Sequence, residues 1–101
     1  MNEQLKKNAT VYWLREDEGG RKNIPSVPKL VAPASVDGPQ GSVDASWSLV
    51  IEMEDQPVMD RTQIVTIHFL VPEAPSHLLV KNAEFIMFDG PRAFLKGQIL
   101  D

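Results

Sequence analysis

The sequence contains no cysteine, which excludes disulfide bonds, thiolate nucleophiles and cysteine-based zinc sites. It also has no run that approaches the roughly 18 apolar residues of a membrane-spanning helix. The opening segment, MNEQLKKNAT, has no apolar core like that of a secretory signal. These absences predict a soluble, cytoplasmic protein that does not bind a membrane.

Positive charge is scarce in this chain. There are 10 lysines and arginines against 14 acidic residues, which gives a formal net charge of −4. General nucleic-acid binding depends on a basic surface, because neutralised phosphates supply most of the affinity. The bases are also scattered along the chain rather than grouped. The composition therefore disfavours a general nucleic-acid binder, although it leaves room for a local basic patch in the fold.

The common catalytic and cofactor motifs are absent as well. Nothing matches G-x-x-x-x-G-K-S/T, whose backbone amides cradle nucleotide phosphates, or the G-x-S-x-G turn of serine hydrolases. The two histidines, His68 and His77, lack the H-x-H and H-x-x-x-H spacings of metal ligands. We therefore expect no catalytic residue, no metal, no nucleotide and no other cofactor, and we expect that the protein is not an enzyme.

Residues that interrupt helices and strands are frequent in this chain. Eight prolines and six glycines are spread over 101 residues, which suits many short strands better than a few long helices. A chain of this length forms one domain rather than two. We expect residues 1–101 to form a single domain, with residues 1–8 as a flexible N-terminus.

Several segments have strand character. Residues 47–53 alternate between apolar and polar faces, and residues 62–71 form the strongest strand candidate. The other predicted strands are residues 9–15, a weak edge strand at 29–33, a short extension at 78–80, and a hairpin formed by 83–88 and 93–100. Residues 35–46, SVDGPQGSVDAS, predict a long exposed loop, because few of them are apolar and many form turns. This pattern predicts an all-β barrel or sandwich, and closure into a barrel would hide the strand edges.

The segment ATVYWLREDEGGR, residues 9–21, resembles the start of the third, C-terminal β-barrel domain of translation elongation factor Tu. In that family a strand of the type A-x-V-Y-x-L enters an acidic D-E-G-G-R turn, and a proline follows. The matching positions are Ala9, Val11, Tyr12, Leu14, Asp17, Glu18, Gly19, Gly20, Arg21 and Pro25. The segment EFIMFDGPRAFLKGQIL, residues 84–100, is similar to the closing hairpin of the family at Phe85, Asp89, Gly90, Arg92, Gly97 and Ile99.

The resemblance implies a small, six-stranded, antiparallel, closed β-barrel of the Greek-key type. It also implies a stand-alone noncatalytic domain without the GTPase, a translation-related context and a protein partner. A contact with transfer RNA is an alternative that the resemblance supports less. The segment APASVDGPQG, residues 32–41, corresponds only loosely to the family segment that helps to contact transfer RNA.

Two groups of residues are candidates for partner binding. The paired glycines after residue 18 either form only a turn or present a contact loop with the arginine that follows. The closing hairpin is apolar on both faces, which predicts either double-sided burial or an exposed patch for a partner or a second copy. The candidate residues are Gly19, Gly20, Arg21, Ile86, Phe88, Arg92 and Phe94.

Two other functions remain open at this point. The barrel could bind a small ligand or act as an enzyme through loops at residues 34–46 and 72–77, in which case a deep pocket with convergent polar groups is expected. It could also act as a decoy that competes for the partners of the elongation factor.

Overall fold

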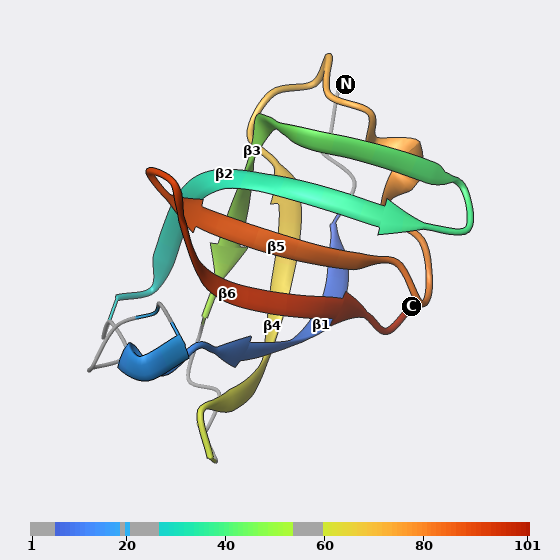
Figure 1. Ribbon diagram of the computed structural model, residues 1–101. Coiled ribbons are helices and arrows are strands. Elements are labelled where there is room, and N and C mark those ends of the chain that lie inside the picture. The colour runs from blue at the N-terminus through green and yellow to red at the C-terminus, as the bar shows by residue number, and fades with distance from the viewer. Residues whose placement is uncertain (1–5, 19, 21–26, 54–59) are drawn as a thin grey trace.

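The computed structural model describes residues 6–18, 20, 27–53 and 60–101 (Figure 1). This part of the chain is all-β, as the sequence predicts, and its strands close into a six-stranded antiparallel barrel. The strands are β1 (Lys7–Trp13), β2 (Lys29–Gly38), β3 (Gly41–Glu52), β4 (Thr62–Phe69), β5 (Glu84–Asp89) and β6 (Arg92–Ile99). Two single turns of 3-10 helix, η1 (Glu16–Glu18) and η2 (Ser76–Leu78), lie in the connections. No helix in the described ranges is long and apolar enough to cross a membrane.

The barrel closes in the order β1-β4-β3-β2-β5-β6, and β6 returns to β1. The strands β2, β3 and β4 follow one another along the chain, while β1 crosses over to lie beside β4, which is the strand order of a Greek key. In Figure 1, β5 and β6 cross in front of β4 and β1. Because β4 and β5 are three strands apart in either direction, their outer faces point to opposite sides of the barrel.

Alternating side chains fill the barrel interior. Most strands turn every second residue inward, as the period of a strand requires. Phe69, Phe85, Leu49 and Ile67 are among the largest fully buried side chains. All of the buried apolar residues except Val50 form one cluster, to which all six strands contribute. The interior is therefore a packed core.

The predicted loop at residues 35–46 is wrong. These residues belong to β2 and β3, which pair as far as Gly38 and Gly41 and are joined by a two-residue turn. The segment has few apolar residues because most of this end of β3 is exposed, while Ala34 and Val36 still point into the core. Pairing of β2 with β5 stabilises these strands, and that contact is not visible in the local sequence.

The predicted strand at 78–80 is also wrong, because η2 ends at Leu78 and the two residues after it are not part of a strand. At the other end of the chain, β1 begins at Lys7, so two residues of the segment expected to be a flexible terminus pair with β4. The backbone N–H of Asn8 donates to Asp101 Oδ1 at 2.8 Å, which ties the start of β1 to the C-terminus. Residues 1–5 lie outside the described residues.

Candidate functional site

Two neighbouring strands, β2 and β5, each carry apolar side chains that point out of the barrel. Ile86 points outward from β5, opposite Ser35 in β2 and Lys96 in β6, and 40% of its surface is exposed. Phe88 lies two residues further along β5 on the same side and is half-buried. The exposure of Ile86 agrees with the patch interpretation of this doubly apolar strand.

The neighbouring strand β2 also carries outward apolar residues. Val31 and Pro33 point outward from β2, as Ser35 does, and Val31 is 45% exposed. Pairing of β2 with β5 ends at Ala34, next to Pro33, which has no backbone N–H to donate. We call Val31, Pro33, Ile86 and Phe88 the β2–β5 outer face. Exposed apolar surface of this kind is a common feature of protein-binding sites.

Phe94 does not belong to this surface. The sequence pattern predicts Phe94 as a partner-binding candidate, but only 3% of its surface is exposed. The register of β5 and β6 shifts between Met87 and Phe88, so β6 contains one extra residue at this point. The bulge allows two consecutive residues, Phe94 and Leu95, to be buried, and the Phe94 ring packs 6.1 Å from the Trp13 ring. The inclusion of Phe94 in a partner surface is therefore wrong.

The predicted hairpin between β5 and β6 is present. Asp89 pairs with Arg92 across a turn at Gly90 and Pro91, and Gly90 has a positive φ of 62°. Arg92 is exposed and lies at the hairpin end of the β2–β5 outer face. The structure thus places Ile86, Phe88 and Arg92 within one hairpin.

The turn after β1 is held by a carboxylate. Glu18 Oε1 accepts hydrogen bonds from the Arg15 backbone N–H and from the Tyr12 hydroxyl, each at 2.8 Å. These two donors hold the pKa of Glu18 below its usual value. The Gly20 N–H donates to Arg15 O, and a Cβ on Gly20 would overlap the Leu14 carbonyl. Gly20 therefore has a structural reason to be glycine, while the candidates Gly19 and Arg21 lie outside the described residues.

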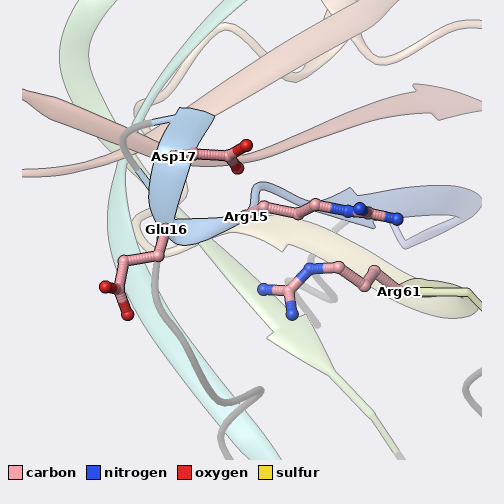
Figure 2. Close-up of a pocket in the computed structure, with 4 residues that line it drawn as sticks. All are labelled: Arg15, Glu16, Asp17 and Arg61. Carbon is pink, nitrogen blue, oxygen red and sulfur yellow. The ribbon is translucent and has the colours of Figure 1, made fainter.

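An open cleft of about 530 Å³ lies beside this turn and is lined by Arg15, Glu16, Asp17 and Arg61. Figure 2 shows the side chains of Arg15 and Arg61 next to each other, whereas Glu16 points away from them. The Arg61 guanidinium donates from Nε to Trp13 O at 2.7 Å and from Nη2 to Leu14 O at 2.9 Å. These bonds give Arg61 a structural role at the end of β1. The cleft is also remote in sequence from residues 34–46 and 72–77, the loops that the sequence offers for a ligand site.

A small charged cluster joins β3 and β4 on the outside of the barrel. Glu52 Oε1 lies 3.2 Å from Lys6 Nζ and 3.3 Å from His68 Nε2. The hydrogen bond from Lys6 is the largest cause that holds the pKa of Glu52 below its usual value, and burial opposes it. His68 Nδ1 lies 2.8 Å from Phe69 O, so both ring nitrogens have partners within the fold. This arrangement favours a structural role for His68.

The fold and these surfaces define the class of protein: a closed six-stranded antiparallel barrel with a packed interior and an apolar outer face on β2 and β5. A scan against models of known protein families gives no match to this chain. A search of curated proteins gives no match either.

Proposed function

We propose that this chain is a noncatalytic protein-binding module that contacts its partner through the β2–β5 outer face. The observation that carries the proposal is the outward exposure of Ile86, on a strand whose inward side chains, Phe85 and Met87, already supply its share of the core. A barrel strand needs only one apolar face to fold. The second apolar face of β5 is therefore available to a partner.

The barrel interior supports the same proposal. Small-molecule sites are concave and lined by apolar groups with a few convergent polar groups. Here large side chains from all six strands occupy the interior. The segment 34–46, considered for a ligand site, is mostly paired strand rather than a loop that could surround a ligand. Binding on the exterior is therefore the function that this geometry supports best.

The context of the proposal is translation. The resemblance of residues 9–21 and 84–100 to the third domain of elongation factor Tu supports this context, since that domain is a noncatalytic barrel that contacts neighbouring domains and protein partners. We expect the partner to be a protein, with transfer RNA as the less favoured alternative.

The experiment is affinity capture from the native cell with the immobilised chain, followed by identification of the retained proteins. The chain is compared with Ile86→Ser and with the control Ile64→Ser, whose isoleucine is 50% exposed on the opposite side of the barrel. The proposal expects a specific protein that the wild type and Ile64→Ser retain and Ile86→Ser loses. Retention of the same proteins by Ile86→Ser and by the wild type would contradict it.

A further inference from the structure

Two carboxylates face each other at one end of the β2–β5 outer face. Asp37 of β2 and Glu84 of β5 are directly opposed in the sheet register, and both side chains are exposed. The next outward pair along these strands is Ser35 with Ile86. The acidic pair therefore adjoins the most exposed apolar residue of β5.

The ion pairs of the described structure do not include either member of this pair. Like charges that lie directly opposite each other on neighbouring strands are destabilising. Glu84 has the neutral Gln98 as its partner on the other side, in β6. Within the described ranges, neither Asp37 nor Glu84 takes part in an ion pair. A cationic group of a partner would reduce the repulsion between the two carboxylates. The pair therefore favours a positively charged group at this position.

We infer that the β2–β5 outer face binds a protein segment in which a lysine or arginine side chain lies about 7 Å from an apolar side chain. That spacing is the distance between alternate residues of a strand, and it separates Glu84 from Ile86 along β5. The apolar side chain of the partner packs on Ile86 and Phe88, while its cation lies between Asp37 and Glu84. An extended segment with one residue between the two side chains has this spacing.

The inference rests on the proposed function and adds the chemistry of the partner. The net charge of −4 acts in the same direction, because a basic partner is attracted over a longer range before contact. A second copy of this chain is the alternative occupant, and it would bring the exposed Arg92 as its cation. The acidic net charge opposes that association, so the basic protein segment is favoured.

The test uses a random dodecapeptide library displayed on phage and selected against the full chain. The inference expects enriched peptides with lysine or arginine one residue away from an aliphatic or aromatic residue. Synthetic copies of these peptides should bind Asp37→Asn and Glu84→Gln at least about tenfold more weakly than the wild type, because each change removes a charge-assisted contact. Glu73→Gln, which removes an exposed carboxylate elsewhere, should bind as the wild type does.

The melting temperatures of the free variants test the repulsion between the two carboxylates separately from peptide binding. Asp37→Asn and Glu84→Gln should each raise the melting temperature of the free protein, because each removes the repulsion between the carboxylates. A lower melting temperature for both variants would overturn the inference, since the carboxylates would then stabilise the fold themselves.

Other outcomes separate the two proposals. Peptides that lose binding on Ile86→Ser but lack a basic residue, or that ignore Asp37→Asn and Glu84→Gln, overturn the inference and leave the proposed function standing. Self-association that Ile86→Ser abolishes would also overturn the inference, because the occupant would be a second copy. Peptides that bind Ile86→Ser and the wild type equally but lose affinity for Ile64→Ser would contradict both proposals.

Discussion

Trp13 Nε1–H donates a 2.7 Å hydrogen bond to Gln63 Oε1 inside the barrel. The indole comes from β1 and the amide from β4, and these side chains are 1% and 5% exposed. Gln63 is the one polar side chain that is buried among the described residues. A buried indole N–H needs an acceptor, so Gln63 allows a tryptophan to fill this end of the core.

Gln63→Met should therefore lower the free energy of unfolding by about 1–3 kcal/mol, because it leaves the Trp13 N–H without an acceptor. Urea unfolding measures this change. The control is the double variant Trp13→Phe/Gln63→Met, in which both partners are gone. Its loss should be smaller than the sum of the two single losses by about 1 kcal/mol. Simple additivity of the two changes would show that the hydrogen bond contributes nothing to stability.

Gly97→Ala should destabilise the barrel by about 1–3 kcal/mol, because it overpacks the core. Gly97 is directly opposite Phe85 in the register of β5 and β6, and the Phe85 ring lies across it. An added Cβ would lie 2.8 Å from Phe85 Cε1 and closer still to Cζ, so the ring must move. Denaturant unfolding of Gly97→Ala, alone and combined with Phe85→Leu, measures the effect. A Gly97→Ala variant as stable as the wild type would contradict the packing described for this pair.

The hydroxyl of Tyr12 should ionise above its ordinary pKa of 10.0. Its hydrogen bond to Glu18, together with the carboxylate charge, raises the pKa of Tyr12. Tyr12 is the single tyrosine of the chain, so phenolate absorbance during an alkaline titration reports this group alone. Glu18→Gln should move the midpoint back toward 10.0, because the negative charge is removed. A midpoint at or below 10.0 in the wild type, or one that Glu18→Gln leaves unchanged, would show that the contact is absent in solution.

The same contact predicts that its contribution to stability is lost both at high pH, through Tyr12, and at low pH, through Glu18. The pKa of Tyr12 is raised on folding, so its contribution is complete below about pH 10 and is lost as the pH rises through the folded-state pKa. The pKa of Glu18 is lowered on folding, so its contribution is present above the unfolded-state pKa and is lost as the pH falls through the folded-state pKa. The urea midpoints of wild type and Glu18→Gln should therefore differ at neutral pH and converge as the pH falls through the folded-state pKa of Glu18. A gap that widens on acidification would contradict this assignment.

Asp60→Gly and Arg61→Gly should change stability in opposite directions. Both residues have positive φ angles, of 52° and 64°, which glycine adopts more easily than other residues do. Asp60→Gly should stabilise the fold by about 1 kcal/mol through relief of this strain. Arg61→Gly relieves the same strain but removes the two hydrogen bonds to the carbonyls of Trp13 and Leu14, so it should destabilise by about 1 kcal/mol or more. Thermal unfolding compares the two variants, and a stabilising Arg61→Gly would contradict the anchoring role of the guanidinium.

The sequence predicts the strands of the barrel correctly where the local alternation of residues or a local turn signal is enough to identify them. The alternation in residues 62–71 correctly predicts β4, and the turn-rich DGPR correctly predicts the hairpin of β5 and β6. The prediction for residues 35–46 is wrong because their strand structure depends on pairing with strands far along the chain, such as β5, which pairs with β2. Local composition cannot show that pairing.

The candidate surface was predictable only in part. Two apolar faces on one strand predict that Ile86 and Phe88 lie either in the core or on an exposed patch, and Ile86 is exposed. Phe94 was misassigned because one extra residue in β6 reverses the direction of the side chains beyond it, and no local signal marks that bulge. The opposition of Asp37 and Glu84 depends on the register between two distant strands, so single-sequence reasoning could not find it.

The central claim is that the β2–β5 outer face binds a protein partner. Its most direct test is the dissociation constant of the captured partner for Ile86→Ser, compared with that for the matched variant Ile64→Ser on the opposite side of the barrel. The account predicts affinity at least about tenfold weaker for Ile86→Ser and unchanged for Ile64→Ser, because loss of a buried aliphatic contact at an interface costs at least this much. Equal dissociation constants for the two variants would contradict it.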